Sequence, residues 1–194
     1  MRNRSAFGVM LSRLMNSRLL ILDLDETLVF ATEEKLARDE DLRVGPYFVY
    51  KRPGLDSFIE FAFNYFKVAI WTSSSRNYAN GTISAIFQHP EQLEFSWARE
   101  RCTRKSDPET GKSYWIKDLK KVRRLGWSLE SVAVIDDSPE KLKRSYGNHI
   151  HVAPFEGDPS DNELPRLQVY LAWLKQVPNV RLVDKRNWRT APVA

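Results

Sequence analysis

The fold of this chain is decided by one stretch near its N-terminus, Leu19-Leu20-Ile21-Leu22-Asp23-Leu24-Asp25-Glu26-Thr27. Its first four residues form a short continuous apolar run, which is typical of a strand buried on both faces of a parallel sheet. Two aspartates follow that strand directly. Removing both carboxylates from water costs free energy unless a cation accompanies them or their pKa values separate. The stretch therefore predicts a cation site at a strand end or, in the simpler interpretation, a strand end at which Asp25 or Thr27 caps backbone N–H groups.

The rest of the chain alternates strands with helices. Apolar runs predict further strands at 67–71, 131–135 and 150–152, and helices are expected after Pro53, after the polar loop 72–75, over 117–125, from Pro139 and over 162–175. This order predicts an α/β fold, a Rossmann-like parallel sheet with helices on both faces. Residues 47–50 predict a small β-hairpin insertion. A large cap domain is not expected, because only about 20 residues separate the first motif from Arg52 and about 40 separate Thr72 from Lys117.

Three predicted strands end in side chains suited to phosphate chemistry. Asp23 and Asp25 follow the first strand, Thr72 follows the second, and Asp136 and Asp137 follow the third. In open parallel sheets, ligands bind beyond the carboxyl ends of the strands. Carboxylate oxygens suit a hard divalent ion, and Mg²⁺ suits a site that also binds phosphate. We therefore expect these residues to form one site.

The composition favours an intracellular protein. The chain has 194 residues, a single cysteine and no apolar run of the roughly 20 residues that cross a bilayer. One cysteine cannot form an internal disulfide, so we expect a reducing compartment, cytoplasmic or nuclear. We also expect no membrane partner and a monomer. One domain is expected over 19–176, between an N-terminal arm (1–18) and a basic C-terminal tail (177–194). The arm holds four arginines and no acidic residue, a composition that a transit peptide shares.

Positive charge is concentrated in one part of the chain. The formal net charge is +5, and residues 99–124 alone hold ten basic and four acidic residues. Such a span attracts anionic partners, among them a phosphorylated substrate. A solvated helix face is the simpler interpretation for most of these residues. A nucleic-acid partner is not favoured, because the span lacks the aromatic platform on which bases stack.

The motifs resemble those of the haloacid dehalogenase superfamily of phosphotransferases. The superfamily's Asp-x-Asp-x-Thr motif after an apolar strand matches residues 21–29. Later segments are similar to the branch that contains the RNA polymerase II carboxy-terminal-domain phosphatases (FCP/SCP, NLI-interacting-factor-like). They are Lys51-Arg52-Pro53-Gly54-Leu55, Trp71-Thr72-Ser73-Ser74, Tyr114-Trp115-Ile116-Lys117-Asp118-Leu119, Val134-Ile135-Asp136-Asp137-Ser138-Pro139, 154–158 and 161–164. The resemblance covers about residues 19 to 176, with the motifs in the expected order.

The resemblance implies a role for each acidic residue. Asp23 would be the nucleophile that attacks phosphorus, and Asp25 would act as general acid and then as general base. Mg²⁺ would be held by the Asp23 side chain, the Asp25 backbone carbonyl and Asp137. Asp136 would support the site as a partner of Lys117, although a helix cap with Ser138 is an alternative for one of the two vicinal aspartates.

The resemblance also implies a phosphate-binding set made of Thr72, Thr27 and Lys117. A phosphate beside four carboxylates needs such a cation, because like charges repel strongly in a partly dry site. Without its neighbours, Lys117 would be read as an ordinary lysine on a helix surface.

Substrate contacts are expected at Arg52, Ser73 and either Arg104 or Lys112. The last two are alternatives because the insertion 105–113 blurs the position of an arginine that close relatives carry before the lysine segment. Phe30 departs from the family pattern as well, because relatives often have histidine there. Both departures concern the substrate entrance, so the resemblance carries over the chemistry more securely than the substrate.

Three functions are consistent with these observations. The first is a phosphomonoesterase that acts through an aspartyl-phosphate on phosphoserine or phosphothreonine in proteins, which an uncapped cleft would admit. The second keeps the chemistry but uses a small metabolite, a nucleotide or a nucleic-acid terminus. The third is a non-catalytic binding or scaffold protein of the same fold, as in the mitochondrial translocase subunit that shares this branch.

Overall fold

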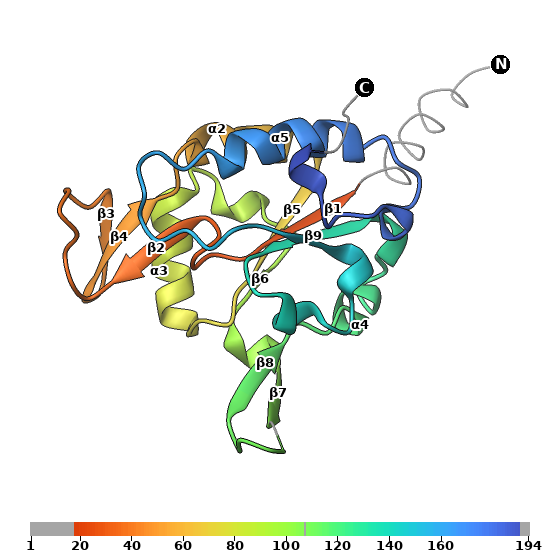
Figure 1. The fold of residues 1–194 in the computed structure, drawn as a ribbon, viewed down its shortest axis with the longest axis horizontal. Helices are drawn as coiled ribbons and strands as arrows, with labels where there is room; N and C mark the ends of the chain where they lie inside the picture. The colour runs from red at the N-terminus through yellow and green to blue at the C-terminus, as the bar shows by residue number, and fades with distance from the viewer. Residues whose placement is uncertain (1–17, 107, 191–194) are drawn as a thin grey trace.

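A five-stranded parallel sheet forms the centre of the molecule. The computed structural model describes residues 18–106 and 108–190. The sheet consists of β1 (Leu19–Leu22), β5 (Lys67–Trp71), β6 (Ser96–Trp97), β9 (Val132–Asp136) and β10 (His149–His151), in the order β10-β9-β1-β5-β6 (Figure 1). β1 lies between β9 and β5, with Leu22 opposite both Ile135 and Ile70. The stretch that decides the fold therefore lies in the middle of the sheet.

Alternate residues of the strands supply two cores, one on each face of the sheet. Leu20, Leu22 and their neighbours on adjacent strands pack against α2 (Leu55–Tyr65), α3 (Arg76–Ile86) and α5 (Glu163–Leu174). Leu19 and Ile21 point to the other face, where they pack with Trp71, the segment around Trp97 and the short α4 (Lys120–Arg123). The predicted α/β class, with a parallel sheet covered on both faces, is confirmed.

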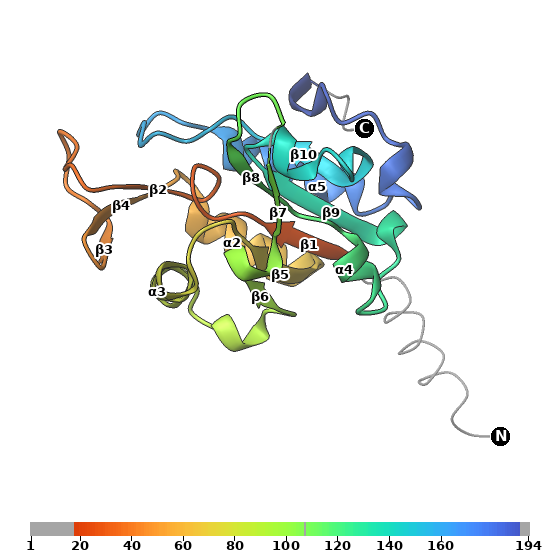
Figure 2. The ribbon, with the colours of Figure 1, turned by 90° about the horizontal axis from the view of Figure 1, so that it is seen from below.

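Two small antiparallel insertions extend from this body. β2 (Val29–Thr32), β3 (Leu42–Val44) and β4 (Tyr47–Lys51) form a three-stranded sheet in the order β2-β4-β3, and β7 (Thr103–Ser106) pairs with β8 (Ser113–Ile116) as a hairpin. Figure 1 shows the two insertions as separate projections from the central body, and Figure 2 shows β2, β3 and β4 extending to one side of it. Within the described ranges no large cap domain is present, as expected.

Short 3₁₀ turns complete the described part of the chain. They are η1 (Pro90–Gln92), η2 (Arg99–Arg101), η3 (Leu129–Ser131), η4 (Pro139–Leu142), η5 (Tyr146–Asn148), η6 (Val180–Leu182) and η7 (Trp188–Thr190). The helix expected from Pro139 is therefore one 3₁₀ turn. The helix expected over 117–125 is only the four-residue α4, and Lys117 precedes it in extended chain directly after β8. Because Lys117 lies in this extended segment and not on a helix surface, its side chain reaches the interior and is fully buried.

The C-terminal segment packs on the domain as far as residue 190. Trp188 is buried beside Tyr170 of α5, with ring centroids 5.8 Å apart, and its indole N–H donates to the His151 carbonyl at 2.7 Å. Arg189 forms an ion pair with Glu163 at the start of α5. The predicted arm lies outside the described residues except for Arg18, and so do residues 191–194 of the predicted tail. No helix of the described part is long and apolar enough to cross a membrane.

Candidate active site

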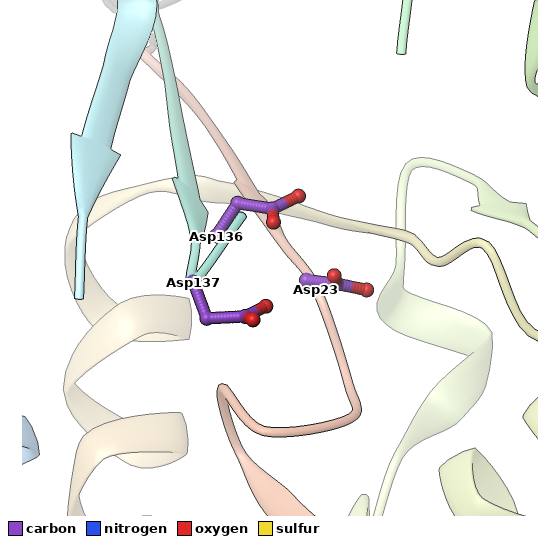
Figure 3. A group of neighbouring side chains, drawn as sticks. All are labelled: Asp23, Asp136 and Asp137. Carbon is purple, nitrogen blue, oxygen red and sulfur yellow. The ribbon is translucent and has the colours of Figure 1, made fainter. Parts of the chain in front are cut away.

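Three aspartates meet at the carboxyl end of the central strands. Asp23 follows β1, and Asp136 and Asp137 lie at the end of β9. One carboxylate oxygen from each residue lies within 4.8 Å of the others, and all three side chains are buried. Figure 3 shows them gathered where β1 and β9 end. The parallel pairing of the two strands creates this cluster from residues more than a hundred positions apart.

The carboxylate of Asp23 is held at both oxygens. Oδ1 accepts the Leu24 N–H at 2.8 Å, and the Asp23 N–H donates to the Ile135 carbonyl at 3.0 Å. Oδ2 lies 3.0 Å from Lys117 Nζ and 3.1 Å from Lys141 Nζ. Burial alone would raise the pKa of Asp23, but the two ammonium groups have the larger effect, so its pKa is lowered overall. Asp23 is therefore ionised and oriented, as a nucleophile requires.

Lys117 is a fully buried cation in the middle of this cluster. Its Nζ lies 2.5 Å from Asp136 Oδ2 in addition to its contact with Asp23. Burial would lower the pKa of Lys117, but Asp136 and Asp23 raise it by more, so the ammonium form persists. Asp136 thus has the lysine partner that the resemblance implies.

The backbone behind the two vicinal aspartates is held by two histidines of β10. His149 Nε2 lies 2.8 Å from the Asp136 carbonyl oxygen, and His151 Nε2 lies 3.0 Å from that of Asp137. Because the partners are carbonyls, each Nε2 is the donor. Burial lowers the pKa of His149 to about 4, so this ring is neutral at physiological pH. Ser138 completes the turn, with its N–H on Asp136 Oδ1 and its hydroxyl on Asp137 Oδ2, both at 2.9 Å.

Asp25 accepts hydrogen bonds from two hydroxyl groups. Tyr78 of α3 donates to Asp25 Oδ1 at 2.5 Å, and Ser74 donates to Oδ2. Burial raises the pKa of Asp25, the hydrogen bonds from Ser74 and Tyr78 oppose this shift, and the charge of Asp23 adds to it; the pKa is raised overall. Two neighbouring aspartates thus have pKa values shifted in opposite directions, as a nucleophile and a proton donor need.

The loop after β5 brings Thr72 and Ser73 to the same edge of the sheet. Thr72 is buried, and its Oγ1 accepts the Ser74 N–H at 3.1 Å. Arg99 Nε donates to the Ser73 carbonyl at 2.6 Å and fixes the loop from outside. The Ser74–Asp25 hydrogen bond joins this loop to the one after β1. The strand ends after β1, β5 and β9 therefore meet.

Thr27 and Arg52 have contacts that differ from those expected. The Thr27 hydroxyl is fully buried and lies 3.4 Å from Asp137 Oδ1, which favours orienting that carboxylate over binding phosphate. Arg52 has no exposed surface. Its guanidinium donates to both carboxylate oxygens of Asp161 at 2.9 and 2.8 Å, to the Thr27 carbonyl at 3.1 Å and to the Ala153 carbonyl at 2.9 Å. With no exposed surface and these partners, Arg52 links the loop after β1 to the segment before α5 and offers no surface to a substrate in this structure.

Arg104 and Lys112 lie on the exposed β7–β8 insertion. Arg104 donates through Nε and Nη2 to the Ser113 hydroxyl across the hairpin, at 3.1 and 2.9 Å. Lys112 is exposed in the connecting turn. No contact with the carboxylate cluster is found for either residue in the part of the chain that the structure describes. Arg99, against the Ser73 carbonyl, is the arginine held directly at the catalytic loops.

Lys141, Tyr78 and Arg99 are site residues that the sequence did not single out. Lys141 contacts the cluster from η4, four positions after Asp137. That spacing is the usual signal for a pair on one helical face, so it was available in the sequence. Tyr78 reaches Asp25 from the first turn of α3, and neither its spacing nor that of Arg99 indicated a contact.

The cluster fits a hard divalent cation. Asp23, Asp136 and Asp137 offer carboxylate oxygens, which Mg²⁺ prefers, and each is already held by hydrogen bonds or ion pairs that orient it. Burial raises the pKa of Asp136 to about 7, against the opposing effect of Lys117. When all three carboxylates are ionised, they and the ammonium groups of Lys117 and Lys141 leave one net negative charge in a buried space. Asp23 and Asp137 are the expected side-chain ligands, and Asp136 is already bound to Lys117.

Comparison with known proteins identifies the family. A family model for the NLI interacting factor-like phosphatases matches residues 18–181. This chain belongs to that family. The family is the carboxy-terminal-domain phosphatase branch of the haloacid dehalogenase superfamily, so the predicted family is confirmed.

Relatives of this chain carry related names. CTD nuclear envelope phosphatase 1B of Danio rerio is 28% identical over 185 residues, covering 88% of this chain and 72% of the relative. A putative CTD phosphatase-like protein, 355R, of Invertebrate iridescent virus 3 is 29% identical over 187 residues, covering 81% of this chain and 97% of the relative. The structure of Fcp1, an essential RNA polymerase II CTD phosphatase, superposes with a TM-score of 0.63 at 17% identity, covering 91% of this chain and 72% of that one. At that identity the superposition supports the fold alone.

Proposed function

We propose that this chain is a magnesium-dependent phosphomonoesterase that removes phosphate from phosphoserine or phosphothreonine in proteins. The observation that carries the proposal is that two aspartates in one loop have pKa values shifted in opposite directions by different partners. Asp23 has a lowered pKa and two ammonium groups on one oxygen, whereas Asp25 has a raised pKa and two hydroxyl partners. A scaffold protein would not need this division, which matches the two roles in acyl-phosphate chemistry.

In the first half-reaction Asp23 attacks phosphorus. Its carboxylate oxygen forms the new P–O bond, and the bond from phosphorus to the serine or threonine oxygen breaks. Asp25, whose pKa is raised, gives a proton to the departing oxygen. Lys117 balances charge around Asp23, and Thr72 donates to a phosphoryl oxygen. The substrate hydroxyl leaves, and an aspartyl-phosphate remains on Asp23.

In the second half-reaction water hydrolyses the aspartyl-phosphate. Asp25 is now the carboxylate and takes a proton from the water that attacks phosphorus, so one group serves both steps. Tyr78 and Ser74 hold this carboxylate in place. Mg²⁺ would be held by Asp23, Asp137 and the Asp25 backbone carbonyl, and when bound it would supply Lewis-acid neutralisation of the phosphoryl charge. Release of inorganic phosphate restores Asp23.

A protein substrate is favoured by the shape and by the names of the relatives. Only two small insertions flank the strand ends in the described ranges, and an open site admits an extended chain. Several relatives are named as phosphatases of the carboxy-terminal domain, and one name places its protein at the nuclear envelope. A cytoplasmic or nuclear location agrees with the free, buried thiol of Cys102.

The decisive experiment is a substrate screen with a matched inactive variant. We expect purified protein with Mg²⁺ to hydrolyse phosphoserine or phosphothreonine peptides more efficiently than sugar phosphates, nucleotides or 3′-phosphorylated oligonucleotides. Asp23→Asn should abolish turnover on all of them while circular dichroism stays unchanged. A preference for metabolites or oligonucleotides would overturn the substrate class alone. Absence of any hydrolysis, including that of an aryl phosphate, would favour a scaffold.

A further inference from the structure

A second lysine reaches the same carboxylates that fit the divalent cation. Lys141 Nζ lies 3.1 Å from Asp23 Oδ2, 3.8 Å from Asp136 Oδ1 and 3.8 Å from Asp137 Oδ1. These are the three residues whose oxygens form the candidate metal cluster. One tethered ammonium group therefore contacts all three members of that cluster.

The two lysines of the site differ in their freedom to move. The Lys117 side chain has no exposed surface and lies between Asp23 and Asp136, whereas 17% of the Lys141 side chain is exposed. The Lys141 backbone is fixed, because its N–H donates to the Ser138 carbonyl at 3.1 Å and its own carbonyl accepts the Lys117 N–H at 2.8 Å. Because part of the Lys141 side chain reaches solvent, it can withdraw from the cluster by rotamer changes while its backbone stays in place. Of the two lysines, Lys141 is therefore the one that can move.

Charge balance argues against Lys141 and a divalent ion sharing the cluster. With all three carboxylates ionised, the cluster and its two ammonium groups sum to one negative charge. A dication added beside both lysines would reverse that sign, whereas exchange of Lys141 for the dication leaves the cluster neutral. Mg²⁺ also needs its oxygens at about 2.1 Å, in a space where the ammonium now contacts the same carboxylates. Like charges so close in a buried site repel strongly.

We propose that Lys141 is an internal counter-cation that competes with Mg²⁺ for Asp23 and Asp137 and thereby sets the affinity of the site for the metal. The proposal rests on the magnesium dependence proposed above. Withdrawal of Lys141 toward solvent accompanies metal binding, and its return keeps the carboxylates together when the metal dissociates. The chain then responds to the Mg²⁺ concentration over a higher range than the carboxylates alone would set.

The test measures Mg²⁺ binding directly, without substrate. Isothermal titration calorimetry with MgCl₂ compares the wild-type chain with Lys141→Met, which keeps the length and removes the charge. We expect the variant to bind Mg²⁺ about tenfold more tightly, equivalent to about 1.4 kcal/mol. Lys143→Met is the matched control: this lysine lies two residues on and contacts the Tyr114 hydroxyl at 2.7 Å, so its loss should leave the dissociation constant unchanged.

The rise in melting temperature on addition of Mg²⁺ provides a second readout, which loss of a purely structural lysine would not change. Lys141→Met should melt at a lower temperature than wild type in chelator and should gain more from saturating Mg²⁺, because ligand binding stabilises according to affinity. Lys141→Gln, which keeps hydrogen-bond donors, replaces the methionine variant should that one fail to fold.

Each outcome of these measurements is decisive. An unchanged or weaker Mg²⁺ affinity in the uncharged variant that folds overturns the proposal, even with an active wild-type enzyme. Tighter binding in a chain without phosphatase activity supports it and counts against the proposed function alone. Absence of Mg²⁺ binding to every variant overturns both the competition and the metal assignment.

Discussion

Arg52→Met removes the guanidinium that links the catalytic loop to the segment before α5. The change leaves the carbonyls of Thr27 and Ala153 without their arginine donor, in a site where Arg52 has no exposed surface. The Asp161 carboxylate would keep the Glu163 N–H as a donor but lose its cation. Removal of one partner of a buried ion pair costs about 3–5 kcal/mol. One kcal/mol shifts the midpoint of a domain of this size by about 2–4 °C, so we expect a fall of roughly 6–20 °C.

The assay is thermal unfolding followed by circular dichroism, with the same measurement at several pH values. Burial would raise the pKa of Asp161, but Arg52 lowers it overall. The stabilisation from this pair is therefore present above the unfolded-state pKa of Asp161 and is lost as the pH falls through the lowered value. The penalty of Arg52→Met should accordingly shrink in acid.

Arg186→Met is the matched control, because it breaks an arginine–aspartate pair with Asp184 that is exposed on both sides and should not shift the midpoint measurably. The reasoning about Arg52 is refuted if Arg52→Met melts like wild type and instead raises only the KM for a phosphopeptide. That result would restore the substrate contact expected from the sequence.

Three further changes test other parts of the site. Tyr78→Phe removes a hydrogen bond that favours ionised Asp25, so the pKa of Asp25 should rise. The alkaline limb of the kcat/KM pH profile should then move to higher pH, and an unmoved limb would exclude Asp25 as the proton donor. Lys117→Met should lower kcat at least about a hundredfold on an aryl phosphate, as loss of one donor to a developing charge does, and near-normal kcat would remove Lys117 from the chemistry. Trp188→Ala should cost about 3–5 kcal/mol of stability in denaturant titrations; a loss below about 1 kcal/mol would show that the C-terminal segment contributes little.

The central strands and the acidic motifs could be predicted because each is a local pattern. The run 19–22 is apolar throughout, so it indicates a doubly buried strand, and the parallel sheet then brings Asp23 and Asp137 to one edge. β6 could not be predicted in the same way. Its two residues, Ser96 and Trp97, are too few to show a period, and they form a strand only because β5 offers a free edge.

Contacts made by long side chains across the fold were harder to predict. Arg52 belongs to a segment next to the site, so a role at the substrate surface was a reasonable expectation. Its burial depends on Asp161, which lies 109 positions away and is not indicated by any spacing. For Lys117, the basic stretch alone predicts a surface lysine, and only the family resemblance placed it beside Asp136. In the structure Lys117 directly follows β8 and contacts Asp136 and Asp23.

The contact between Trp188 and His151 gives the C-terminus influence over the reaction centre. The indole N–H donates a hydrogen bond to the His151 carbonyl, and the His151 ring is hydrogen-bonded to the backbone carbonyl of Asp137. These contacts join the chain's last described turn to the backbone of one member of the cluster. A shortened chain that stops at residue 176, just after α5, would lose these hydrogen bonds. Affinity tags and fusion partners are therefore better attached at the other terminus, and comparisons between homologues should include the residues that follow their last helix.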